Sequence, residues 1–98
     1  MQIYAQNTTR IHLENRKSNH SKFYEVWGGI YRNITTKEIT EAFVGMCYGR
    51  IGSKGRTLFQ TFLGHYCHAD ALDFLGKKVE EKLARGYEII SELDNGKT

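Results

Sequence analysis

The alternation of apolar and polar residues divides the chain into two parts. Before about residue 63 the pattern repeats every two residues, which indicates strands with one buried face; the expected strands cover residues 10–14, 22–31, 39–51 and 56–63. From about His68 to Arg85 the apolar spacing becomes three and four, which is typical of an amphipathic helix. We therefore expect a helix whose apolar stripe is buried against a sheet; the stripe consists of Leu72, Leu75, Val79 and Leu83.

Several local features refine these elements. Gly86 is suited to follow a helix C-terminus. Gly28–Gly29 predicts a bulge or bend in the second strand, and residues 87–90 can add a short last strand. The strand over 56–63 has apolar residues on both faces, so we expect it to be covered on more than one side.

These elements predict an α+β fold: a single antiparallel β-sheet of four to five strands with one α-helix packed across one face. The chain has 98 residues, which is the size of one small domain. We expect residues 10–90 to form its core and residues 1–9 and 94–98 to be flexible ends.

A glycine-rich turn is the most distinctive stretch of the sequence. It covers residues 45–56 and reads Gly-Met-Cys-Tyr-Gly-Arg-Ile-Gly-Ser-Lys-Gly-Arg. Glycine permits positive φ and close backbone approach, and a turn with free N–H groups and cations can hold an anion. Arg50, Lys54 and Arg56 supply the cations, and Tyr48 supplies an aromatic contact. The simpler interpretation is a plain hairpin turn with incidental charges.

The run from Tyr48 to Gly55 resembles the signature of the WGR domain, which is named for Trp-Gly-Arg; here Tyr48 stands in place of the Trp. Residues 21–24, Ser-Lys-Phe-Tyr, resemble the Asn-Lys-Phe-Tyr opening strand of that family, and residues 71–87 resemble its helix and the exit from it. The family usually has Ser or Thr at the N-cap of this helix, and the resemblance places Cys67 there, which is a poor capping residue. The resemblance covers roughly residues 10–90. It points to a small bacterial-type member, related to the domain found in DNA-damage-activated poly(ADP-ribose) polymerases.

The resemblance implies a non-catalytic nucleic-acid-binding module that recognises DNA ends, nicks or 5′-phosphates. By position in the motif, Tyr48 is expected to pack on a terminal sugar or base, and Arg50, with Gly49 beside it, to contact DNA or a partner domain. Lys22 and Asn19 are expected near the terminal phosphate. Lys54 and Arg56 are added on their charge alone. Of the other aromatics, Phe23 is expected in the core.

Other binding and catalytic motifs fit poorly. The turn is followed by a strand rather than a helix, which argues against a P-loop or a dinucleotide fingerprint, and Gly-Ser-Lys-Gly does not join two helices as a KH loop does. Four residues are of types that bind zinc: Cys47, His65, Cys67 and His68. They contain no Cys-x-x-Cys pair, which argues against a zinc site. No nucleophile is paired with a base. We expect no enzyme activity, no metal and no cofactor, and Cys47 and Cys67 as free thiols.

Charge leaves two classes of partner open. The net charge is +3, with nine Lys/Arg against four Asp/Glu in residues 1–66, so an anionic partner is permitted. Because no membrane span or secretion signal is recognisable, we expect a cytoplasmic protein that binds no membrane. The alternative to DNA is a protein–protein interaction module that docks through its aromatic sheet face. Salt separates the two, since phosphate contacts weaken steeply with salt and apolar docking does not.

Overall fold

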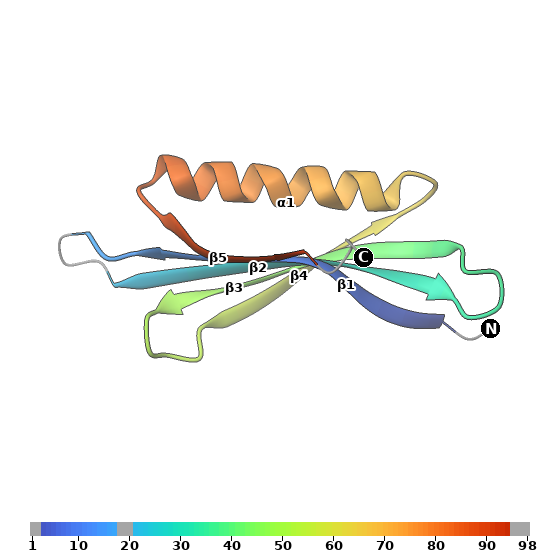
Figure 1. Cartoon of the computed structure of the whole chain (residues 1–98), viewed down its shortest axis with the longest axis horizontal. Coiled ribbons are helices and arrows are strands. Elements are labelled where there is room, and N and C mark those ends of the chain that lie inside the picture. Colours follow the sequence, from blue (N-terminus) through green and yellow to red (C-terminus); the bar gives the residue numbers. More distant parts are fainter. Residues whose placement is uncertain (1–2, 18–20, 95–98) are drawn as a thin grey trace.

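The computed structural model of the chain describes residues 3–17 and 21–94, which form one antiparallel sheet with one helix on one face (Figure 1). The elements follow in the order β1 (Ile3–Asn15), β2 (Lys22–Asn33), β3 (Ile39–Arg50), β4 (Arg56–Leu63), α1 (Cys67–Ala84) and β5 (Glu88–Asp94). The sheet has the strand order β4-β3-β2-β1-β5. The α+β fold expected from the sequence is therefore confirmed, with β5 returning beyond the helix to pair with β1.

The core lies between the sheet and α1. Because side chains alternate across a strand, every second residue of β1, β2 and β3 points toward the helix. The largest fully buried side chains are Leu13, Val26, Ile30 and Val44, and Ala42 and Met46 complete the layer. Burial of these groups supplies the main stabilisation of so small a domain.

The helix presents a narrower stripe to the sheet than the sequence suggests. Its buried residues are Cys67, Ala71, Leu75 and Val79, four apart from one another. Leu75 and Val79 are buried as expected, but the prediction for Leu72 and Leu83 is wrong, since they are 42 % and 43 % exposed. The physical reason is placement: α1 packs against β2, β3 and β4, so apolar residues at the margin of the stripe have no sheet beneath them.

The N-terminal end of α1 differs from the expectation from the sequence, and its C-terminal end agrees with it. The N-cap is Tyr66 rather than the expected Cys67, and no side chain caps the first turn. Cys67 is instead the first helical residue and is buried in the core, which accounts for an apolar thiol at this position. At the other end Gly86 has φ +95°, and its N–H donates to the carbonyl of Leu83, as expected for a glycine that ends a helix.

The outer strands are longer than the alternation indicates. β1 begins at Ile3, well before the expected start at Arg10, and β5 continues to Asp94. The irregularity expected at Gly28–Gly29 is present, but the extra residue is Thr8 of β1, opposite these glycines. Among the described residues no helix is long and apolar enough to cross a bilayer.

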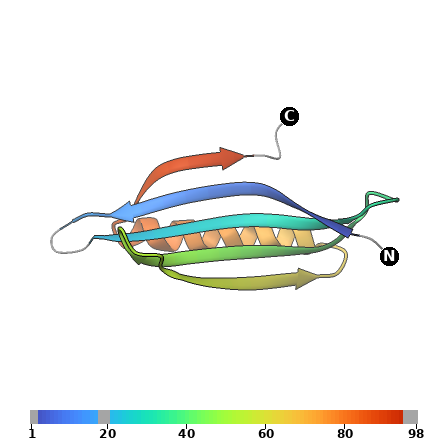
Figure 2. The same cartoon turned by 90° about the horizontal axis from the view of Figure 1, so that it is seen from below.

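Figure 2 views the sheet from the face that has no helix. On this face aromatic rings lie over glycines. A Cβ on Gly29 would lie 2.0 Å from the ring of Phe43, and one on Gly45 would lie 2.2 Å from the ring of Trp27. Phe23, expected in the core, belongs to this open face and is half-buried. Glycine at these positions makes room for cross-strand rings that cover the backbone.

β4 is an edge strand, and its expected coverage is wrong. It pairs with β3 on one side, and no strand pairs with its other side among the described residues. Seven of its eight residues are exposed, including Phe59 at 64 % and Leu63 at 73 %. The helix touches it chiefly through Phe74, whose ring lies 5.5 Å from that of Phe62.

Candidate functional site

A basic hollow of about 330 Å³ lies at the end of the sheet where β3 enters the glycine-rich turn. This pocket is lined by Lys22, Tyr48, Gly49, Arg50, Lys82, Arg85 and Tyr87. These residues come from β2, from the end of β3, and from the last turn of α1 and its exit. Figure 1 shows that the β3–β4 hairpin and the C-terminal end of α1 lie at the same end of the molecule. We call this hollow the basic pocket.

Strand register places the β2 and β3 residues of the basic pocket. Lys22 is paired with Arg50, and Tyr24 with Tyr48. Directly paired residues project from the same face of an antiparallel sheet, and Tyr24 is buried in the core on the helix side. Lys22, Tyr48 and Arg50 therefore project toward the helix side, where the end of α1 meets them.

The helix exit brings the remaining groups. After Gly86 reverses the chain, the N–H of Tyr87 donates to the carbonyl of Lys82 at 3.1 Å. The ammonium of Lys82 lies 4.7 Å from the centroid of Tyr24 and 5.6 Å from that of Tyr87. Cation–π contacts of this kind hold a lysine head group in place. Lys82 is thus a positioned cation rather than a free surface one.

The aromatic part of the pocket is a pair of tyrosines on adjacent strands. The rings of Tyr24 and Tyr48 are stacked with centroids 6.3 Å apart. Burial, to which the charge of Glu81 adds, raises the pKa of Tyr24 to about 12, so its phenol is neutral at physiological pH. Tyr48 is 36 % exposed and offers its outer surface to a ligand.

Positive charge in the basic pocket is poorly neutralised. Among the described residues no carboxylate lies within ion-pair distance of Lys22, Arg50 or Lys82. Arg85 has Glu81 at 3.7 Å, a long and exposed contact. Burial, and then the positive charge of Arg85, lowers the pKa of Lys82. A cluster of cations that repel one another is suited to bind an anion with several oxygens, such as a phosphate.

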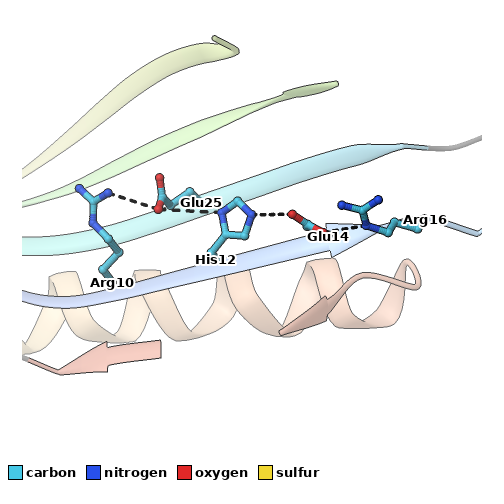
Figure 3. Close-up of polar contacts among 5 residues, drawn as sticks. All are labelled: Arg10, His12, Glu14, Arg16 and Glu25. Carbon is cyan, nitrogen blue, oxygen red and sulfur yellow. Dashed lines mark hydrogen bonds and ion pairs between the residues drawn. The ribbon is translucent and has the colours of Figure 1, made fainter. Parts of the chain in front are cut away.

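On the opposite face of the sheet, a row of polar side chains is linked by ion pairs and hydrogen bonds that neutralise its arginines (Figure 3). His12 Nε2 lies 3.0 Å from Glu14, and Arg16 contacts the same carboxylate at 2.9 Å. Glu25 contacts Arg10 at 3.2 Å. The hydrogen bonds from His12 and then Arg16 lower the pKa of Glu14. In this row Arg10 and Arg16 each have a carboxylate partner, in contrast to Lys22, Arg50 and Lys82 of the basic pocket.

The glycine-rich turn separates the cations that the sequence grouped together. Gly52 and Gly55 have φ of +94° and +73°, so glycine is required there. Lys54 lines a different hollow, on the open face, with His12, Phe23 and Cys47 among its neighbours. Arg56 is paired with Tyr48 across the strands but does not line the basic pocket.

Of the residues singled out from the sequence, the structure brings Lys22, Tyr48, Gly49 and Arg50 together. Asn19 lies outside the described residues. Sequence reasoning missed Lys82, Arg85 and Tyr87, because cations in a last helical turn are explained well enough by the helix dipole. The available signal was Gly86 followed by Tyr87: a chain reversal at this point returns the helix end to the sheet.

The thiols and imidazoles considered for zinc are not gathered around one point. Cys47 lies on β3, and its thiol contacts the carbonyl of Lys54 at 3.4 Å. Cys67 is buried at the start of α1, and the ring of His65 packs on Tyr66. In residues 3–17 and 21–94 no group of three or more His, Cys, Asp or Glu side chains is placed to hold a metal ion.

Comparison with known proteins gives a family. The chain matches the family model described as the WGR domain over residues 7–94. No curated protein and no solved structure matches. WGR domains are in general nucleic-acid-binding modules and are not catalytic. Because the match covers the helix, β2 to β5 and most of β1, we conclude that the chain belongs to the WGR domain family.

Proposed function

We propose that this domain binds DNA at a free end and that the basic pocket receives the terminal 5′-phosphate. The observation that carries the proposal is the cluster of Lys22, Arg50 and Lys82, which have no carboxylate partner among the described residues and face two tyrosines. A terminal phosphate carries more charge than an internal one and is open on one side. A pocket at the end of a sheet is accessible to it.

Each group has a role that its chemistry supports. Arg50 can hold two phosphate oxygens with its planar guanidinium, while Lys22 and Lys82 act as point charges. Tyr48 packs on the terminal sugar or base, where stacking distinguishes an end from a continuous duplex. Lys54 and Arg56 lie outside the pocket and attract the backbone of any DNA. Asn19 remains a candidate from the family motif.

The open sheet face supports a second candidate, docking of another protein. Phe59 is 64 % exposed and packs edge-on against Trp27 at 5.9 Å and Phe43 at 6.3 Å. Exposed aromatic clusters of this kind occur at protein interfaces. The two candidates use opposite faces of the sheet, so they are separable by mutation.

The test is a fluorescence-anisotropy titration with a DNA hairpin that has one free end, compared with the same hairpin lacking its 5′-phosphate and with a closed dumbbell. We expect the tightest binding to the phosphorylated end, and an affinity that falls steeply between two salt concentrations. Arg50→Gln should remove the preference for phosphate. Lys37→Gln, which removes one exposed charge from the hairpin at the other end of β2 and β3, is the matched control.

Equal affinity for all three DNAs would contradict end recognition while leaving DNA binding intact. Binding to none of them at low salt would refute DNA as the partner. The protein-docking candidate would then be tested through Phe59→Ser, which alters the open face without touching the basic pocket.

A further inference from the structure

The two edges of the sheet differ in their protection against pairing. An edge strand exposes unpaired N–H and C=O groups, and proteins usually block it with charges, prolines or bulges. β5 carries Glu88 and Glu92, and its pairing with β1 has a register shift. β4 carries one charge, Arg56, at its first position, contains no proline, and pairs with β3 in unbroken register.

β4 is also apolar on both faces. Phe59 projects to the open face, where it contacts Trp27, and Phe62 projects to the helix side, where it contacts Phe74. From Thr57 to Tyr66 the sequence contains no Asp, Glu, Lys or Arg. An unpaired edge of this composition, with its single charge at the first position, is a template for another strand.

We propose that β4 is a self-association edge, where a second copy of this chain pairs antiparallel with it and joins five strands from each copy into one continuous sheet. This inference is independent of DNA binding and goes beyond the proposed function.

The sequence of β4 favours a second copy because it is self-complementary. A two-fold interface requires that the same strand meets itself. With the two-fold axis at Gln60, Leu58 faces Phe62 on the helix side, and on the open face Phe59 faces Thr61 and Thr57 faces Leu63. All of these pairs keep each side chain on the face that it already occupies, and the pairs are apolar or carry β-branched threonine, which suit cross-strand packing.

The distribution of charge along β4 is compatible with the same arrangement. Arg56 begins the strand, so the antiparallel copy places the two guanidinium groups at opposite ends of the interface. The middle of the strand pair contains no charge of either sign, and repulsion between copies is therefore small. A charged peptide suits β4 less well: an acidic peptide could pair only with Arg56, and a basic peptide could pair with no carboxylate of this strand.

The helix leaves room for this pairing. Figure 2 shows α1 behind the middle of the sheet and β4 along one margin. Because the two-fold axis is perpendicular to the sheet, the helices of both copies lie on the same face. The basic pockets then also lie on one face, at opposite ends of the joined sheet.

The interface is short, which sets the expected affinity. One strand pair of this length with its neighbouring side chains falls at the low end of specific interfaces, below about 1,200 Å². We expect a reversible dimer with a dissociation constant between about 1 µM and 1 mM.

Sedimentation velocity over this concentration range tests the proposal with a charge swap at the axis. Gln60 is exposed, and its side chain makes only a long contact to the carbonyl of Thr61 at 3.5 Å. Gln60→Lys and Gln60→Glu each place like charges directly opposite one another, so each variant alone should remain a monomer. An equimolar mixture of the two should form dimers at least as readily as the parent chain.

Ser91→Lys, an exposed position on the β5 edge, is the matched control and should dimerise like the parent. Circular dichroism establishes that every variant is folded. Amide exchange adds a readout that folding alone does not change: protection of residues 57–63 should increase with concentration in the parent chain and in Ser91→Lys, but not in either Gln60 variant alone.

A parent chain that stays monomeric up to about 1 mM would overturn the proposal. So would a folded Gln60→Lys variant that dimerises like the parent, or a mixture of the two charge variants that stays monomeric. Loss of the dimer in Ser91→Lys would place the interface at β5 and refute the assignment to β4. None of these outcomes depends on DNA, so they leave the proposed function untouched.

Discussion

Replacing Lys82 by Gln tests whether the end of the helix belongs to the DNA-binding surface. Lys82 is not among the site residues expected from the sequence, and the structure places it in the basic pocket. The change removes one positive charge and keeps a polar side chain of similar reach. Lys77→Gln on the same helix is the matched control, because Lys77 is 74 % exposed and pairs with Asp73 at 3.0 Å.

The magnitude follows from the contact that is lost. A hydrogen bond to a charged group contributes about 1.5–3 kcal/mol, and we take the lower part of that range because Lys82 is only half-buried and partly screened. A loss of about 1.5–2 kcal/mol corresponds to a roughly tenfold to thirtyfold weaker complex at low salt. Removing one phosphate contact should also reduce the slope of log K against log salt by about 0.9.

The assay is an anisotropy titration of both variants with the 5′-phosphorylated hairpin at several salt concentrations. Lys77→Gln should change the affinity and the slope little, since its charge is already paired at a distance from the pocket. Equal effects of the two substitutions would show that only the net charge matters. The reasoning from the basic pocket would then be refuted.

Three further predictions concern the core, the tyrosine and the open face. Leu75→Ala should lower the free energy of unfolding by about 2–5 kcal/mol. Leu72→Ala, at a 42 % exposed position, should lower it by less than about 1 kcal/mol. If the thermal melting curves of the two variants coincide, the observed helix orientation is contradicted. Tyr48→Ala should lose about 1–3 kcal/mol of binding to DNA with a free end, with an unchanged salt slope, and an equal loss on the closed dumbbell would argue against stacking at the end. Gly45→Ala should displace Trp27 and destabilise the fold by about 1–3 kcal/mol. The displacement should be visible in the fluorescence emission of the single Trp. Gly76→Ala is the control: nothing lies within 4 Å of an added Cβ there, so the change should be neutral or stabilising.

The fold could be predicted because its determinants are local. The period of two in the strands and the change to a period near 3.6 after residue 67 follow from backbone geometry alone. The hairpin register around the glycine-rich turn is fixed by Gly52 and Gly55, which take positive φ. These features are readable in a single sequence, and β4 was predicted with the bounds that the structure gives.

Which face of α1 packs on the sheet, and the position of β4 at the sheet edge, could not be predicted in the same way. Leu72 and Leu75 are equally apolar, and only the position of α1 over β2, β3 and β4 decides that one is exposed and the other buried. Similarly, apolar residues on both faces of a strand indicate coverage on both faces, but β4 lies at an edge. Strand order depends on contacts far apart in the sequence, so alternation within one strand cannot reveal it.

The candidate site was predicted in part for a related reason. Lys22, Tyr48 and Arg50 meet through pairing of β2 with β3, and the motif already links them. Lys82, Arg85 and Tyr87 join them only because α1 ends above the same end of the sheet. Conversely, Lys54 and Arg56 are close to Arg50 in sequence, yet the turn places Lys54 at a hollow on the open face. Arg56 pairs with Tyr48 but is not among the residues that line the basic pocket.

Placing Lys82 in the basic pocket has a cost in folding free energy, which its lowered pKa indicates. The folded chain holds the pKa of Lys82 below its value in the unfolded chain, chiefly by burial and then by Arg85. Folding thus disfavours the charged ammonium, and this cost is present at neutral pH. It is relieved only as the pH rises through the folded pKa toward the ordinary value of 10.5. Under the proposed function, a phosphate in the pocket would replace part of the lost hydration and offset the repulsion between Lys82 and Arg85. Its binding should therefore stabilise the folded chain.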